Sequence, residues 1–143
     1  MANWNKRFID LAHHVASWSK DQSTQVGAVI ASPEHRILSV GYNGFPMGAN
    51  DDVESRHERP QKYLYTEHAE RNAIYSAARA GVNISGCTIY IMLFPCADCA
   101  RAIIQSGLSK VVCYAPDSHQ HYKDSFEVAK ELFDECNIKV EYI

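Results

Sequence analysis

The sequence lacks the basic excess of proteins that bind polynucleotides. Its 14 Lys and Arg residues are outnumbered by 17 Asp and Glu residues, and the formal net charge is −3. Proteins that hold nucleic acids chiefly through phosphates carry an excess of positive charge. The chain also has no run of about 18 apolar residues, the length that a membrane span needs. We therefore expect neither a nucleic-acid polymer nor a membrane as a partner.

The sequence also predicts neither an export signal nor a disulfide framework. Residues 1–10 are polar and have no apolar core of the kind found in secretory signals. The five cysteines are an odd number, and disulfides are rare in the reducing cytoplasm. We therefore expect a cytoplasmic protein, in which a Cys-x-x-Cys pair either binds a metal or is redox-active.

The remaining composition is ordinary for a globular protein. The chain has 143 residues, of which 46% are hydrophobic and 22% charged, enough for one domain with its own core. No repeat, low-complexity tract or linker divides it. We therefore expect a single domain over residues 1–143.

Hydrophobic periodicity predicts helices that alternate with strands. The expected helices cover residues 3–17, 67–80, 95–106 and 124–136. The expected strands cover residues 26–31, 36–42, 87–93, 110–114 and 138–142, and a polar loop runs from residue 43 to about 62. A helix, a hairpin and then three strands alternating with helices are typical of an α/β protein, here a three-layer α/β/α sandwich with a five-stranded mixed sheet.

Two short motifs fall at the starts of predicted helices, where ligands of such sheets bind. The first is His68-Ala69-Glu70, and the second is Pro95-Cys96-Ala97-Asp98-Cys99. Taken alone, a helical histidine is more often a solvated or core residue than a ligand. The two cysteines alone could equally be a redox pair or buried thiols.

Together the motifs predict a catalytic metal site. One His and two Cys give three protein ligands, which leaves the fourth position of a zinc ion open; a structural zinc has four. Zinc lowers the pKa of a bound water to about 7. Two helix N-termini would favour ionised thiolates. Glu70, two residues from His68, would lie beside the metal and transfer protons without binding it.

These motifs resemble those of the cytidine and deoxycytidylate deaminase superfamily, whose signature is H-x-E followed by P-C-x-x-C. The resemblance extends to V-G-A-V-I at 26–30, H-A-E-R-N-A-I at 68–74, P-C-A-D-C-A at 95–100 and Y-K-D-S at 122–125. G-Y-N-G-F-P at 41–46 is similar to the branch that acts on deoxycytidylate (dCMP).

The resemblance implies a role for each residue of the two motifs. His68, Cys96 and Cys99 would bind one catalytic zinc ion. Glu70 would protonate ring nitrogen 3 and pass a proton to the leaving ammonia. The backbone N–H of Ala69 would contact the carbonyl oxygen of the base.

The resemblance also implies a substrate and regulation. The reaction would be the hydrolysis of dCMP to dUMP in pyrimidine nucleotide metabolism. Asn43 would contact the sugar, Tyr122 the base or sugar, and Lys123 the 5′-phosphate. Members of the family form hexamers that dCTP activates and dTTP inhibits, and Tyr42 and Gly44 would belong to the effector site. The acidic stretch at 51–58 would then either hold a magnesium–triphosphate effector or be a solvated loop.

Other functions remain open at this point. A deaminase of the tRNA-adenosine type or another cytidine type shares both motifs, as does a deaminase of the riboflavin pathway. A non-catalytic zinc module would need a fourth protein ligand and would have no use for Glu70. A thiol oxidoreductase built on Cys96 and Cys99 would bind no metal.

Overall fold

The computed structural model describes residues 1–116 and 123–143. One sheet contains the strands β1 (Gly27–Ala31), β2 (Ile37–Tyr42), β3 (Thr88–Ile91), β4 (Lys110–Cys113) and β5 (Lys139–Tyr142). The long helices are α1 (Trp4–Ala16), α3 (Ala69–Ala80), α4 (Ala97–Gln105) and α5 (Lys123–Glu135). All nine elements agree with the predicted ones to within about two residues at each end. The helix expected to begin at Pro95 begins at Ala97, because the preceding Cys96 has an extended backbone.

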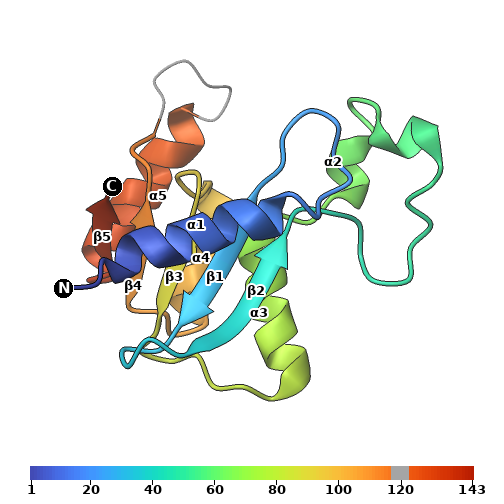
Figure 1. The fold of residues 1–143 in the computed structure, drawn as a ribbon. Helices are drawn as coiled ribbons and strands as arrows, with labels where there is room; N and C mark the ends of the chain where they lie inside the picture. Colours follow the sequence, from blue (N-terminus) through green and yellow to red (C-terminus); the bar gives the residue numbers. More distant parts are fainter. Residues whose placement is uncertain (117–122) are drawn as a thin grey trace.

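The strand order β2-β1-β3-β4-β5 brings three distant loops to one edge of the sheet. Strand β1 is antiparallel to both of its neighbours, whereas β3, β4 and β5 are parallel. Strands β2, β3 and β4 therefore run in the same direction, and their carboxyl ends lie together (Figure 1). The segments that follow Tyr42, Ile91 and Cys113 converge at this edge, where ligands of open α/β sheets bind.

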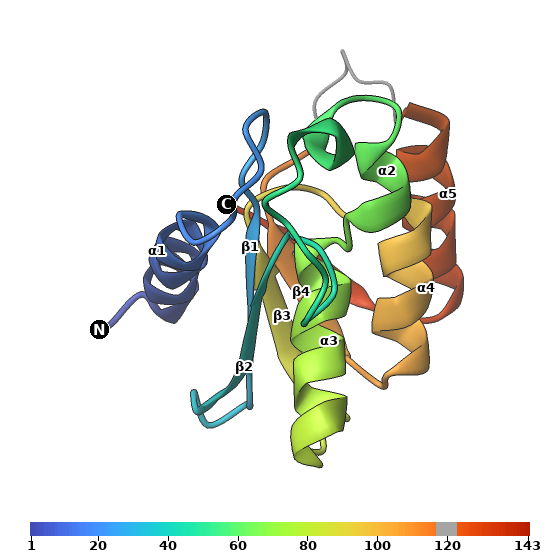
Figure 2. The same ribbon diagram turned by 90° about the vertical axis from the view of Figure 1, so that its right-hand side faces the viewer.

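The helices form two layers around the sheet. Helix α1 lies on one face, and α3, α4 and α5 lie on the other (Figure 2). On the α1 side, Phe8, Ile9 and Ala12 pack against Val29 and Tyr90. The larger core lies between the sheet and the other helices and includes buried side chains of β1, β3 and β4. The predicted three-layer sandwich with a five-stranded mixed sheet is confirmed.

Helix α3 lies close to β2 because Gly41 has no side chain. A Cβ atom at Gly41 would lie 2.3 Å from the backbone nitrogen of Ala73 and 2.5 Å from the carbonyl oxygen of Ala69. The Ser39 hydroxyl, two residues earlier on the same face of β2, donates a 2.7 Å hydrogen bond to the Ala73 carbonyl. The position of the first turns of α3 is thus set directly by the backbone of β2.

Residues 45–66 leave the sheet as an excursion between two paired residues. At its neck, Gly44 and Glu67 exchange backbone hydrogen bonds of 3.1 and 2.8 Å. The predicted polar loop from residue 43 to about 62 is only partly correct, because it contains a 3-10 helix, η1 (Glu54–His57). A short helix that was not predicted, α2 (Lys62–Tyr65), follows it. Both helices are too short to produce a hydrophobic period in the sequence. They fold around Phe45, whose ring stacks on His57 at 4.7 Å between centroids and packs against Tyr65 at 5.4 Å.

Within the described part of the chain, the longest helices have 13 residues, and no helix is long and apolar enough to span a membrane.

Candidate active site

The two predicted metal motifs place their ligands at the starts of two neighbouring helices. His68 is the N-cap of α3, and Cys96 is the N-cap of α4; both have extended backbones. Cys99 lies in the first turn of α4 and is fully buried. An N-cap is usually Ser, Thr, Asp or Asn, whose side chain bonds the first amides of the helix. Neither His68 nor Cys96 makes such a bond, so both side chains remain available to a shared ligand.

The spacing of these three side chains fits a tetrahedral zinc ion. The His68 Nδ1 atom lies 3.6 Å from Cys96 Sγ and 3.4 Å from Cys99 Sγ, and all three ligand atoms lie within 4.8 Å of one another. Zn–S and Zn–N bonds of about 2.3 and 2.0–2.1 Å at tetrahedral angles separate S from N by about 3.5 Å. The observed distances match this edge length. The arrangement therefore suits one zinc ion with an open fourth position.

The site also favours a thiolate at Cys96. A hydrogen bond from Cys99, opposed by burial and assisted by His68, lowers the pKa of the Cys96 thiol to about 4. The neighbouring Cys96 raises the pKa of Cys99, and burial adds to this effect. A low thiol pKa is typical of cysteines beside cations and helix N-termini.

Glu70 lies beside the three candidate ligands but is not one of them. It belongs to the first turn of α3 and is 6% exposed. Burial raises the pKa of its carboxyl group, against the hydrogen bond with Cys99 and the charge of His68. A carboxyl with a raised pKa holds its proton more readily, so it can serve as a general acid as well as a general base. The fully buried Ala69 precedes it as the first residue of α3, a position whose backbone N–H has no partner within a helix.

Charged side chains to which the sequence motifs assign no role join helices α3 and α4. The Arg71 Nε atom lies 2.5 Å from Glu67 Oε1, and its guanidinium lies 3.6 Å from Asp98 on α4. The same Glu67 oxygen accepts a 3.1 Å hydrogen bond from the His68 backbone. The i, i+4 spacing of Glu67 and Arg71 was a usable signal for their pair, but the link to Asp98 depends on tertiary structure.

The G-Y-N-G segment lies at the same edge of the sheet. Asn43 is buried, with its side-chain oxygen bonded to the Val26 N–H and its side-chain nitrogen bonded to the Thr24 carbonyl. The Tyr42 carbonyl accepts a 2.8 Å hydrogen bond from Asn72 on α3. This segment is thus attached to the helix that carries His68 and Glu70.

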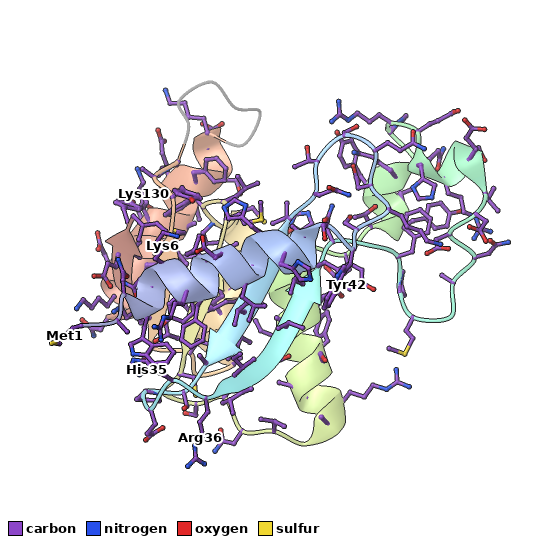
Figure 3. The ribbon with its side chains drawn as sticks, viewed as in Figure 1. Met1, Lys6, His35, Arg36, Tyr42 and Lys130 are labelled. Atoms are coloured by element: carbon purple, nitrogen blue, oxygen red, sulfur yellow. The ribbon has the colours of Figure 1, made fainter. Side chains whose placement is uncertain are left out.

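A pocket of about 100 Å³ lies beside this segment, and its lining includes Tyr42 and Gly44. Tyr42 is at the end of β2, close to the end of α1 (Figure 3), where its ring meets Trp18 edge to face at 6.1 Å. Lys20 also lines the pocket and pairs with Asp51 at 2.8 Å. Aromatic faces suit a ring-containing ligand. The carboxylates Asp21 and Asp51 also line the pocket, so Lys20 gives it no positive excess.

Of the remaining predicted residues, Lys123 is exposed as the first residue of α5. Tyr122 lies outside the described residues. The structure thus brings His68, Ala69, Glu70, Cys96 and Cys99 together, and it places Tyr42, Asn43 and Gly44 on a segment bonded to α3.

Comparison with known proteins agrees with this geometry. Residues 2–115 match the model of the cytidine and deoxycytidylate deaminase zinc-binding region. The chain is 43% identical to an uncharacterized deaminase of Aliivibrio fischeri, over all of this chain and 95% of that protein. It is 37% identical to human deoxycytidylate deaminase, over 94% of this chain and 76% of that one.

A solved structure shares the fold over almost its whole length. This is the dCMP deaminase of cyanophage S-TIM5 in complex with dCMP and dUMP, which is 26% identical in sequence. The match has a TM-score of 0.77 and covers 96% of this chain and 95% of that one. On the family model and on these relatives, the chain belongs to the cytidine and deoxycytidylate deaminase family.

Proposed function

We propose that this protein is a cytoplasmic, single-domain deaminase over residues 1–143 that hydrolyses dCMP to dUMP, with one zinc ion bound by His68, Cys96 and Cys99. The observation that carries the proposal is the combination of a three-ligand site with a buried carboxyl, Glu70, that adjoins the ligands without joining them. A non-catalytic zinc module would have neither the open position nor that carboxyl.

Each residue has a task in this reaction. His68, Cys96 and Cys99 would hold a zinc ion, which would supply a water that is nucleophilic at neutral pH. Glu70 receives a proton from the attacking water and delivers it to ring nitrogen 3. It then transfers the second proton of that water to the amino group, which leaves as ammonia while the oxygen remains on the ring as a carbonyl. The backbone N–H of Ala69 donates to the base carbonyl oxygen and orients the ring. Asn43 contacts the sugar, Tyr122 the base or sugar, and Lys123 the 5′-phosphate.

A substrate panel tests this proposal. The protein is assayed with dCMP, CMP, deoxycytidine, cytidine and a short RNA, and loss of the amino-pyrimidine is followed by ultraviolet absorbance. We expect dCMP to have the highest kcat/KM. A charge-assisted contact to phosphate corresponds to about 10- to 150-fold in favour of dCMP over deoxycytidine. Equal values for dCMP and deoxycytidine would reject the nucleotide specificity, and preference for the RNA would favour a deaminase that acts on cytidine within RNA.

We further propose that dCTP activates and dTTP inhibits the enzyme through the pocket beside Tyr42 and Gly44, with a magnesium ion on the triphosphate and a hexamer as the responding unit. A short path of two backbone hydrogen bonds and one peptide bond supports this regulation. Gly44 is paired with Glu67, and Glu67 is followed directly by the ligand His68. A ligand that moved Gly44 would thus act on the start of α3, which carries both His68 and Glu70.

Rates measured against dCMP concentration test this regulation. We expect a sigmoidal curve that dCTP makes hyperbolic and that dTTP shifts to higher dCMP, with a coupling of about 1–3 kcal/mol. The variant Tyr42→Ala should respond to neither triphosphate while its basal curve persists. Curves of the parent protein that neither triphosphate changes would remove the regulatory proposal and leave the catalytic one intact.

A further inference from the structure

The first backbone amides of α4 need a hydrogen-bond acceptor from outside the helix, because the side chain of the N-cap residue does not supply one. The first amides of a helix have no acceptor within the helix, and the N-cap side chain normally supplies one. In α4 the N-cap is Cys96, whose side chain makes no cap hydrogen bond and faces His68 and Cys99.

Ser125 supplies an acceptor from a distant part of the sequence. Its hydroxyl oxygen accepts a 2.7 Å hydrogen bond from the backbone N–H of Ala97, the first residue of α4. Ser125 is the third residue of α5 and lies 28 positions after Ala97 in the chain. The contact is partly buried, so water competes with it less than at an open surface.

Aromatic packing fixes the same junction. Phe126, the residue after Ser125, is buried and meets the ring of Phe94 edge to face, with centroids 5.6 Å apart. Phe94 lies two residues before Cys96, and its ring also contacts Phe133 farther along α5. The start of α5 is thus held against the segment that leads into the metal motif, with the Ser125 oxygen directed at the amide beside Cys96.

We propose that Ser125 is a positioning residue of the metal centre: its hydroxyl holds the first turn of α4 so that Cys96 and Cys99 are presented together with His68. The inference rests on the proposed zinc site. Groups that orient metal ligands affect metal retention beyond their effect on folding, by about 10- to 100-fold in affinity or activity when they are lost.

Another hydroxyl on α4 provides a control for a purely structural role. At the other end of the helix, the Ser106 hydroxyl donates a 2.9 Å hydrogen bond to the Ile103 carbonyl. Ser106 is the C-cap of the same helix, at the end opposite to Cys96 and Cys99. Removing its hydroxyl also costs α4 one hydrogen bond, which makes Ser106→Ala a matched control.

The decisive comparison is between Ser125→Thr and Ser125→Val. The two replacements have nearly the same shape, and only threonine keeps the hydroxyl. The parent, both variants, Ser125→Ala and Ser106→Ala are loaded with zinc, and zinc release to a chromophoric chelator is timed together with kcat and KM for dCMP. Thermal midpoints are recorded for all five proteins.

We expect Ser125→Val and Ser125→Ala to release zinc about 10- to 100-fold faster than the parent and to have a lower kcat when fully loaded. Ser125→Thr and Ser106→Ala should stay within about threefold of the parent. If Ser125→Val does not fold, Ser125→Ala, the smaller change, decides. Release rates of Ser125→Ala or Ser125→Val equal to those of Ser106→Ala would overturn the inference. A parent protein that binds no zinc would overturn the proposed function itself.

Discussion

Asn43 and Val26 continue the pairing of β1 and β2 beyond the ends of both strands. The Asn43 backbone N–H donates to the Val26 carbonyl at 3.2 Å, and the Asn43 side-chain oxygen accepts from the Val26 N–H at 2.8 Å. The side chain thus takes the place of a backbone acceptor, and its nitrogen bonds Thr24 as well. The residue predicted to contact the sugar is therefore also a structural link.

Asn43→Ala should accordingly lower stability as well as substrate binding. Loss of the side chain leaves the partly buried Val26 N–H without an acceptor, which costs about 1–3 kcal/mol. Urea unfolding curves measure this loss, and KM for dCMP measures the sugar contact. An unchanged urea midpoint together with a raised KM would mean that only the substrate contact matters.

Glu70→Gln should keep its zinc and lose its activity. The amide has nearly the same shape as the carboxyl but cannot relay protons. Loss of a general acid/base costs about 10²- to 10⁴-fold in kcat. Zinc content by atomic absorption and kcat from the ultraviolet assay separate the two properties. A variant within a few-fold of the parent in kcat would show that another group moves the protons.

Metal removal should destabilise the protein, because binding energy at such a site contributes to folding. Cys96→Ser and His68→Ala should lose both zinc and activity, and their thermal midpoints should approach that of the chelator-treated parent. Cys136→Ser is the matched control, since Cys136 is exposed and belongs to no metal cluster among the described residues. Full zinc occupancy in Cys96→Ser would reject the ligand assignment.

Gly41→Ala and Gly44→Ala should behave differently although the two residues are close in sequence. A methyl group at Gly41 collides with the α3 backbone at 2.3 Å, whereas at Gly44 the nearest atom is a Tyr42 ring carbon at 3.9 Å. Overpacking typically costs about 1–3 kcal/mol, so Gly41→Ala should lower the urea midpoint clearly. Gly44→Ala should fold like the parent and change only the response to triphosphates. Equal stabilities would contradict the close contact of α3 with β2.

Acid should weaken the ion pair between Asp21 and Lys62, whose side chains lie 3.3 Å apart and are each 10% exposed. Burial raises the pKa of Asp21, but the backbone N–H groups of Thr24 and Ser23 together with Lys62 outweigh it, so the pKa lies below its usual 3.8. A depressed pKa contributes stability that is present above the unfolded-state pKa of about 3.9 and is lost as the pH falls through the folded-state value.

Urea midpoints between about pH 5 and pH 2.5 should therefore fall more steeply for the parent than for Asp21→Asn. The control is Asp10→Asn, which removes the exposed ion pair of Lys6 and Asp10. Exposed ion pairs contribute little to the free energy of unfolding. Parallel pH curves for the parent and Asp21→Asn would mean that this carboxyl carries no acid sensitivity.

The sequence contained more information about the long helices and strands and the metal ligands than about the short helices and the side chain that hold them in place. The strands and long helices were predictable because each shows a clear hydrophobic period, and the ligands because His68, Cys96 and Cys99 lie in two short motifs. The helices η1 and α2 were not predictable from the sequence. A helix of four residues is too short to show a hydrophobic period, and both helices depend on contacts with Phe45. Ser125 was visible only as part of a family resemblance, because its partner Ala97 is defined by tertiary structure.

The backbone pairing of Gly44 with Glu67 separates changes in residues 45–66 from changes at the metal site. Residues 45–66 begin and end at paired positions, so length gained or lost between them need not shift His68, the residue after the neck. Doubling the length of such a loop costs only about 0.6 kcal/mol in closure entropy. Insertions and deletions within the excursion can therefore leave the metal motif in place, as long as Asp51 and Lys62 keep their ion pairs with Lys20 and Asp21.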